Sequence, residues 1–220
     1  MLKSAALSLS LASITSIAPI YADNDFYLSV GAGIAYPSDA ESEYTTGGTK
    51  YDITEETDDP GIFSLGFGKK FDNNFRIEFN YSKATVSTDS FKVTSGGSGV
   101  TGSITPALEY DVATYMIYGL KDFSNDSKFT PYAGIGAGFA TFDADDQIAT
   151  IAGTAYSFTF EEESVFSYAL KGGISYEVTD NASLFTELGY VHLGSYESEG
   201  NVNYDSNNLV GLSAGVRFSF

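Results

Sequence analysis

Five charged side chains stand in segments that are otherwise rich in glycine and apolar residues: Arg76, Glu78, Lys171, Glu187 and Arg217. Each lies on the small or polar side of a run in which polar and apolar residues alternate. Two interpretations follow, an ion-lined passage or a network of salt bridges that fills an interior. Because an unpaired buried charge is costly, we favour the network of salt bridges.

The only histidine, His192, is followed by Ser195 and Glu197, which raises the question of a hydrolase site. A serine nucleophile needs a histidine base within hydrogen-bond reach. Alternate residues of a strand share a face, so a serine three positions after the histidine lies on the wrong face. The position on the same face, Gly194, has no side chain. We therefore expect no catalytic residue and interpret His192, near the outer end of its strand, as an interfacial aromatic residue.

Two acidic runs could ligate Ca²⁺ through oxygen atoms: Asp143, Asp145 and Asp146, and Glu161 to Glu163. Neither run has the glycine-punctuated spacing of a dedicated calcium loop, and runs of like charge are usually solvated. The Gly96–Gly99 segment has no lysine after it, which argues against a phosphate-binding loop. The chain also has no cysteine. The sequence predicts neither a metal site nor a cofactor.

The strands that must carry these side chains are clearest in residues 208–220. The even positions are apolar: Val210, Leu212, Ala214, Val216, Phe218 and Phe220. The odd positions from Gly211 to Ser219 are small or polar. A period of two predicts a strand with one apolar face. In a membrane barrel that face contacts lipid, and the small or polar face fills the lumen.

Seven more segments read as strands, which makes eight: residues 26–36, 61–71, 75–86, 108–121, 129–142, 163–177, 182–194 and 208–220. Short turns at 72–74, 122–128 and 179–181 alternate strictly with long polar segments at 37–59, 87–106, 143–162 and 195–207. We expect these long segments to be mobile loops, with Thr154–Phe160 as a candidate strand extension. The faces of residues 108–121 stay unassigned, because Tyr115 to Tyr118 are apolar at successive positions.

Aromatic residues mark one end of the expected strands. Seven lie next to the short turns or the chain ends: Phe26, Phe71, Phe75, Phe123, Phe129, Tyr176 and Phe220. Phe185 falls at the same level, but its position in the alternation places it on the inward face of its strand. One aromatic residue per strand at one level is typical of the girdle at a membrane interface.

The negative charge is concentrated at the opposite end. Residues 37–59 contain eight acids and one lysine, residues 143–163 contain six acids, and residues 195–207 contain three. Lys3 is the only charged residue before Asp23, so residues 23–220 have a net charge of −19. The three segments together contribute −16 of that charge. Strong acidity argues against nucleic acid as a partner.

Residues 1–22 read as a signal peptide, with Lys3 followed by an apolar, serine-rich run and a small residue, Ala22, at the expected cleavage point. We expect residues 23–220 to form one domain. That domain has no run of roughly 20 apolar residues that could span a membrane as a helix. A chain of this kind crosses a membrane only as a closed barrel.

The terminal phenylalanine, the alternation before it, the strand count and the unequal connections resemble the small Gram-negative outer-membrane barrels of the opacity-protein and outer-membrane-protein-A-like group. The resemblance covers nearly all of residues 23–220. It implies an all-β fold, an eight-stranded antiparallel up-and-down transmembrane β-barrel with short periplasmic turns and long extracellular loops. It also implies that Val216, Phe218 and Phe220 form the signal read by the barrel-assembly machinery.

The expected function is non-enzymatic: a structural or surface-interaction protein of adhesin or surface-antigen type, exported to the cell outer membrane. The expected partners are outer-membrane lipid and lipopolysaccharide, the assembly machinery and a host or environmental surface ligand. The first alternative is a small porin-like channel. A more distant one is a lipid A-modifying enzyme, although the enzymes of this kind among similar barrels carry serine two residues after histidine, and here that position is Gly194.

Overall fold

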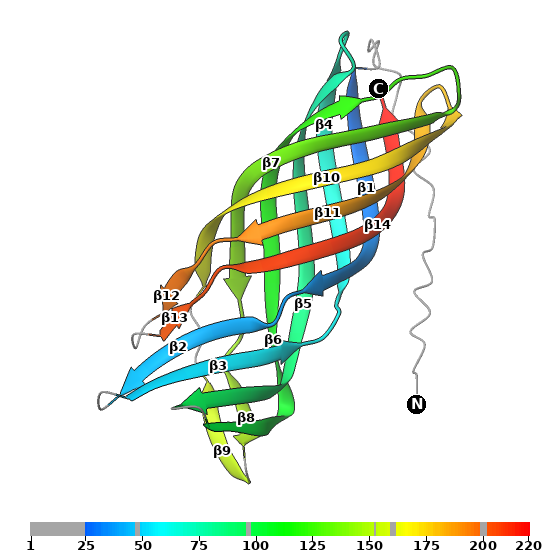
Figure 1. Ribbon diagram of the computed structural model, residues 1–220. Helices are drawn as coiled ribbons and strands as arrows, with labels where there is room; N and C mark the ends of the chain where they lie inside the picture. The colour runs from blue at the N-terminus through cyan, green and yellow to red at the C-terminus, as the bar shows by residue number, and fades with distance from the viewer. Residues whose placement is uncertain (1–24, 47–48, 96–97, 152, 159–161, 199–201) are drawn as a thin grey trace.

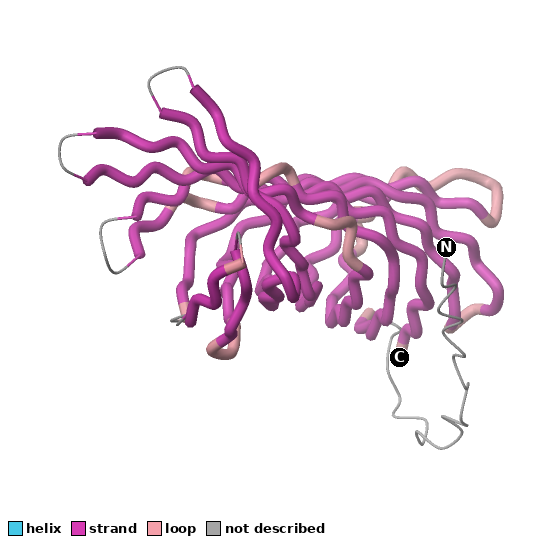
Figure 2. The backbone as a smooth tube through the Cα atoms, turned by 90° about the horizontal axis from the view of Figure 1, so that it is seen from below, coloured by secondary structure: helices cyan, strands magenta, loops and turns pink. Residues whose placement is uncertain are grey.

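The computed structural model describes residues 25–46, 49–95, 98–151, 153–158, 162–198 and 202–220. The predicted signal peptide, residues 1–22, lies outside the described residues. Within them the chain is almost entirely β-strand joined by short loops (Figure 2). None of the described segments is a helix with the length and apolarity needed to cross a bilayer.

Eight strands form a closed ring: β1 (Phe26–Pro37), β4 (Gly61–Phe71), β5 (Phe75–Ser95), β6 (Ser98–Asp122), β7 (Phe129–Asp143), β10 (Glu163–Thr179), β11 (Ala182–Leu193) and β14 (Asn207–Ser219). Neighbours pair antiparallel in the order β5-β4-β1-β14-β11-β10-β7-β6, and an additional β5–β6 pairing closes the ring. All eight predicted strands are therefore present as an up-and-down barrel (Figure 1). Closure leaves no unpaired strand edge in the ring.

The outward face of the barrel is apolar, as the alternation predicts. On β14 the even positions point outward, and Leu212 and Phe218 are about half exposed, at 54 % and 48 %. Arg217, between Val216 and Phe218, is only 5 % exposed and faces the lumen. In a barrel that spans a membrane, the exposed leucine, isoleucine and phenylalanine side chains contact lipid rather than water.

The structure assigns the faces of β6. Tyr115 and Ile117 point outward and are 43 % and 61 % exposed. Met116 and Tyr118 are buried in the lumen, at 1 % and 6 % exposed. All four successive residues are apolar because both faces of the strand meet apolar surroundings: the outward pair contacts lipid, and the inward pair packs in the interior of the barrel.

The long connections differ from the expectation, because most of their described residues are β-structure rather than mobile loop. Six short strands form there: β2 (Ala40–Thr46), β3 (Thr49–Thr57), β8 (Gln147–Ile151), β9 (Thr154–Phe158), β12 (Tyr196–Ser198) and β13 (Val202–Tyr204). Strands β5 and β6 also continue well beyond their predicted ends. The long connections lie where they were predicted, and only their expected mobility was wrong, because a neighbouring strand provides a template along which their polar residues pair.

These segments form what we call the outer sheet: β2, β3, β8, β9, β12, β13 and the parts of β5 and β6 beyond the barrel. Strand β3 pairs with β5 from Asp52↔Thr94 to Thr57↔Thr88. Strand β13 pairs with β2, and β8 pairs with β6 at Ile104 and Thr105. The candidate extension at Thr154–Phe160 is in part confirmed, since β9 forms there, although it pairs with β8. The outer sheet projects from the end of the barrel opposite the C-terminus (Figure 1).

The short turns lie at the end of the barrel that carries the C-terminus (Figure 1). Asn74 closes the first of them in the left-handed region, at φ 59°, where asparagine is tolerated better than most residues. Asn73 Oδ1 accepts a hydrogen bond of 3.2 Å from the Phe75 amide and so stabilises the turn. We call this end the short-turn end, and the opposite end the outer end.

Candidate functional site

Glu78 of β5 is the centre of a polar network inside the barrel. Its side chain is 2 % exposed and accepts two hydrogen bonds, from the Lys171 ammonium at 2.6 Å and from the Tyr27 hydroxyl at 2.8 Å. Lys171 also lies 3.4 Å from Glu187, whose other partner is the Tyr132 hydroxyl at 3.0 Å. One cation thus bridges two carboxylates, in surroundings where an isolated charge would be costly.

Arg76 joins the same network at its short-turn side. Its Nε and Nη2 atoms lie 3.0 and 2.9 Å from Asp122 Oδ1, and its Nη1 donates to the Tyr27 hydroxyl at 3.1 Å. Arg217 is held differently. It donates to the Ser175 hydroxyl at 2.8 Å, and its guanidinium lies 5.0 to 5.4 Å from the ring centroids of Tyr27, Phe185 and Tyr132.

All five predicted network residues therefore lie in the lumen, although only Glu78, Lys171 and Glu187 form one continuous set of ion pairs. Sequence reasoning missed the neutral members and one acid: Tyr27, Asp122, Tyr132 and Ser175. The same parity that selected the charges would have found them, because they occupy the small or polar face of their strands. It could not have shown which of them touch.

Glycines on the lumen face make room for the large side chains of this network. A Cβ on Gly68 would lie 2.2 Å from the Tyr27 ring, and one on Gly173 would lie 2.7 Å from the Tyr132 ring. A Cβ on Gly136 would meet the Tyr118 ring at 2.6 Å. The glycines opposite these tyrosines are thus part of the interior packing of a narrow barrel.

An apolar cluster fills the lumen at the level of the polar network and beyond it toward the outer end. Its buried members come from six of the ring strands: Ala35, Met116, Tyr118, Leu120, Tyr132, Ala140, Val165, Ala169, Val191, Leu193 and Leu209. Several lie farther from the short turns than the network residues of the same strand, as Val165 does relative to Lys171. The interior is therefore a packed core, in agreement with the size of an eight-stranded barrel.

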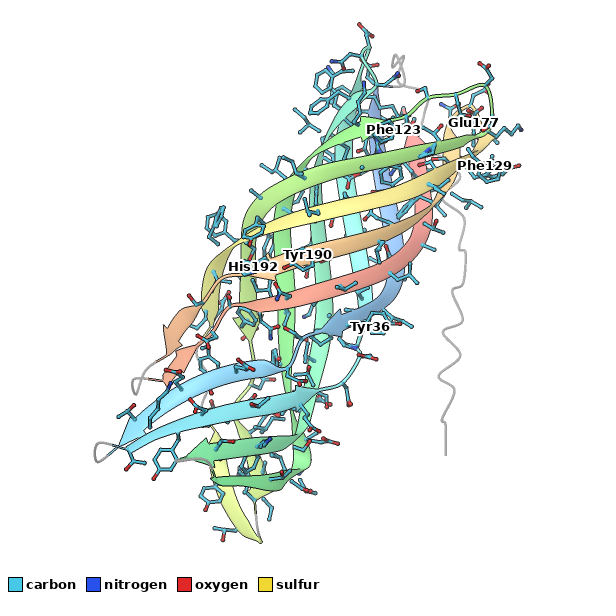
Figure 3. All side chains as sticks on the ribbon, viewed as in Figure 1. Tyr36, Phe123, Phe129, Glu177, Tyr190 and His192 are labelled. Atoms are coloured by element: carbon cyan, nitrogen blue, oxygen red, sulfur yellow. The ribbon has the colours of Figure 1, made fainter. Side chains whose placement is uncertain are left out.

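Two levels of aromatic residues flank the apolar band. Phe123 and Phe129 lie toward the short-turn end, whereas Tyr36, Tyr190 and His192 lie farther along the barrel (Figure 3). The other predicted girdle residues, Phe26, Phe71, Phe75, Tyr176 and Phe220, are 36 to 41 % exposed. Phe185 is 7 % exposed and points inward, as its parity predicts. Of the outer level, only the interfacial position of His192 was predicted.

His192 belongs to this outer level. Its ring stacks on Tyr168 at 4.5 Å between centroids, and Nδ1 lies 2.9 Å from Asn208 Oδ1. Ser195 is exposed and follows the end of β11. These contacts place His192 in an aromatic, hydrogen-bonded surface position.

The outer sheet contains a carboxyl group in an unusual position. Glu55 of β3 lies within electrostatic range of Tyr110 of β6 and Tyr204 of β13, and burial raises the pKa of its carboxyl above the ordinary value. Burial also raises the pKa of the Tyr110 hydroxyl. By contrast, hydrogen bonds from Lys83 and Thr85 lower the pKa of Asp111. Among the described residues, no cluster of three or more histidine or acidic side chains could hold a metal ion.

Comparison with known proteins shows which family has this architecture. The family model described as the outer membrane protein beta-barrel domain matches residues 4–218. A candidate adhesin of Rickettsia canadensis is 26 % identical over 212 residues, which cover 89 % of this chain and 88 % of that protein.

Two solved structures share the fold. Neisserial surface protein A is similar with a TM-score of 0.53 at 18 % identity, over 89 % of this chain and 97 % of that one. The outer membrane protein OprG from Pseudomonas aeruginosa has a TM-score of 0.52 at 14 % identity, over 89 % and 96 %. With its closed ring of eight strands and apolar outer face, the chain belongs to the outer membrane protein beta-barrel domain family and is a protein of the Gram-negative outer membrane.

Proposed function

We propose that this protein is a non-enzymatic surface-interaction protein, of adhesin type, whose barrel holds an acidic outer sheet away from the membrane. The length of β5 and β6 carries the proposal. They contain 21 and 25 residues, whereas a tilted strand crosses a bilayer in roughly 9–11 residues. The remaining length serves as the template on which the outer sheet is built.

The charge of the outer sheet supports a cationic partner. Exposed acids lie on several of its connections, among them Asp58, Asp59, Asp145 and Asp146. A surface with one sign of charge accelerates encounters with the opposite sign and repels like charges. The name of the Rickettsia canadensis relative agrees with a role in attachment.

The porin-like alternative has less support. Lys171, Glu78 and Met116 are all buried across the lumen, and an eight-stranded barrel leaves an interior only wide enough for side chains. An ion would have to displace both the salt bridges and the apolar cluster. The lipid A-modifying alternative also lacks support, because His192 Nδ1 is engaged by Asn208 and its ring by Tyr168.

We also propose that Val216, Phe218 and Phe220 are read by the barrel-assembly machinery. Phe218 and Phe220 are 48 % and 37 % exposed on the outer face of the barrel. The Phe220 amide donates to the Phe26 carbonyl at 2.9 Å, which holds the chain end beside β1. The final strand therefore presents its aromatic side chains at the closing seam of the ring.

Adhesion of cells that display the protein tests the function. Cells carrying the wild-type protein should attach to a surface coated with a basic polypeptide more strongly than cells without it, and added salt should weaken the attachment. Neutralising Asp58, Asp59, Asp145 and Asp146 to asparagine should reduce it.

The matched control neutralises Asp72 and Asp126, which are exposed acids on the short turns. This variant should attach as the wild type does. Equal attachment by all three proteins at equal surface level, or an equal loss in both variants, would count against the outer sheet as the contact surface.

A further inference from the structure

The short-turn end of the lumen contains a polar cavity of about 140 Å³. Three cations line it: Lys70 of β4, Arg76 of β5 and Arg217 of β14. The hydroxyl groups of Thr130, Ser175 and Ser219 line it as well. The surface-interaction function makes no use of this cavity.

Two of the three cations stand directly opposite one another. Lys70 and Arg76 are cross-strand partners in the β4–β5 register, and both face the lumen. Like charges at opposed positions of neighbouring strands destabilise a sheet. Asp122 forms a salt bridge with Arg76, at 2.9 Å, and none with Lys70.

Neither Lys70 nor Arg217 forms a salt bridge with a described residue. Among the described residues, no carboxylate oxygen lies within 4 Å of either side chain. Lys70 Nζ donates to the neutral Ser219 hydroxyl at 2.7 Å. Glu177 and Asp180 also line the cavity, but both are exposed to solvent.

Arg217 carries the clearest sign of a missing partner. The residue is 5 % exposed, yet its buried Nε makes no hydrogen bond to any described group. A buried donor without an acceptor is costly, and more so when it is charged. The aromatic rings around the guanidinium stabilise its charge but accept no hydrogen bond from Nε in the plane of the group.

We propose that this cavity is a binding site for a phosphate group, held by Arg217, Lys70 and the surrounding hydroxyls. A guanidinium edge matches an oxyanion in a planar, two-bonded geometry, and an ammonium adds a point charge. The anion supplies the acceptor that Arg217 Nε lacks and separates the opposed charges of Lys70 and Arg76. Either inorganic phosphate or the phosphate of a phospholipid headgroup has this chemistry.

Isothermal titration calorimetry of the full chain, refolded in a nonionic detergent, tests the site. Sodium phosphate is titrated at an ionic strength matched with sodium chloride. Saturable binding of phosphate is expected, and Lys70→Gln should weaken it by about tenfold or more, since one charged contact of this kind corresponds to at least one factor of ten in Kd. Lys128→Gln, which removes an exposed lysine of a short turn outside the cavity, should bind as the wild type does.

A second arm identifies the source of the phosphate. Competition by a short-chain phosphatidylglycerol at the same site assigns a headgroup, and its failure to compete assigns the free anion; both results support the site. Arg217→Gln should also lose binding, and Lys70→Gln keeps the measurement informative where that variant does not refold. The proposal would be overturned if titration with phosphate gave the same heat as titration with sodium chloride. It would also be overturned if Lys128→Gln weakened phosphate binding as much as Lys70→Gln does.

Discussion

The ammonium of Lys171 on β10 lies 2.6 Å from the carboxylate of Glu78 on β5, although the two residues are 93 positions apart in the chain. Two strands, β6 and β7, separate β5 from β10 along the shorter side of the ring. The contact therefore crosses the lumen instead of following the wall. It ties the two sides of the barrel together and fills the centre of the passage.

Removing Lys171 should destabilise the barrel strongly. Lys171→Met leaves Glu78 and Glu187 without their shared cation, and breaking a buried ion pair from one side costs about 3–5 kcal/mol. Urea titration in detergent, followed by the heat-modifiable shift on gels, measures the loss. Lys83→Met, which breaks the exposed Lys83–Asp111 pair, should change little; equal losses in the two variants would show that the lumen pair is not a stability determinant.

The wild-type barrel should not conduct ions steadily. The buried network and the apolar cluster leave no continuous polar path, and the interior of an eight-stranded barrel is filled by side chains. Planar-bilayer recording of the refolded protein should give no stable single-channel steps, with a conducting porin as the positive control for the bilayer. Reproducible current steps of constant size would instead support the porin-like function.

A methyl group at Gly68 should disturb the network through Tyr27. The added Cβ would lie 2.2 Å from a ring held between Glu78 and Arg76, and overpacking of this kind costs about 1–3 kcal/mol. Gly189→Ala is the matched control, since a Cβ added there would have no atom within 4 Å apart from those of its own residue and its two chain neighbours. Tyr27→Leu should restore part of the loss in Gly68→Ala; similar urea midpoints for the two glycine variants would contradict the close packing.

The outer sheet should become more stable as the pH falls. Burial raises the pKa of Glu55 in the folded sheet, so the folded form binds a proton more tightly than the unfolded form, and stability is lost as the pH rises through the folded pKa. Amide hydrogen exchange in β3 should be slower in Glu55→Gln than in the wild type at neutral pH. In acid, where Glu55 is protonated, the difference should disappear.

The exchange rates of Glu55→Gln and the wild type are compared at the same pH, because the intrinsic rate of amide exchange itself depends on pH. Glu56→Gln serves as the control, because Glu56 is exposed on the other side of the same strand. Among the described residues, the hydroxyls of Tyr110 and Tyr204 are the titratable groups on other elements whose pKa Glu55 raises. A pH-independent difference between Glu55→Gln and the wild type would show that the carboxyl keeps one protonation state.

Loss of the terminal aromatic side chain should slow assembly more than it weakens the finished barrel. Phe220→Ala keeps the amide that bonds to Phe26 and removes one lipid-exposed ring. The expected result is less folded protein in the outer membrane of expressing cells, with a near-normal urea midpoint for the purified, refolded variant. Phe123→Ala, at the same level of the barrel but distant from the final strand, should leave assembly unchanged.

The sequence by itself determined the wall of this barrel. The period of two places each residue inside or outside, and the turns and aromatic residues mark the strand ends; hence residues 61–71 and 129–142 were predicted within one residue of β4 and β7. The inward parity of Arg76, Glu78, Lys171, Glu187 and Arg217 follows from the same alternation. These features are local, since side-chain direction along a strand depends only on position.

The tertiary structure decided which inward residues meet. Parity indicates the face of a residue but not its height on the far side of the ring, because strand stagger is a property of the closed barrel. Glu187, on the strand next to that of Lys171, lies 3.4 Å from it, but Glu78 from across the lumen is closer, at 2.6 Å. For the same reason, only the closed ring brings Lys70 and Arg217 to one cavity, and only a finished β5 and β6 provide the template for the outer sheet.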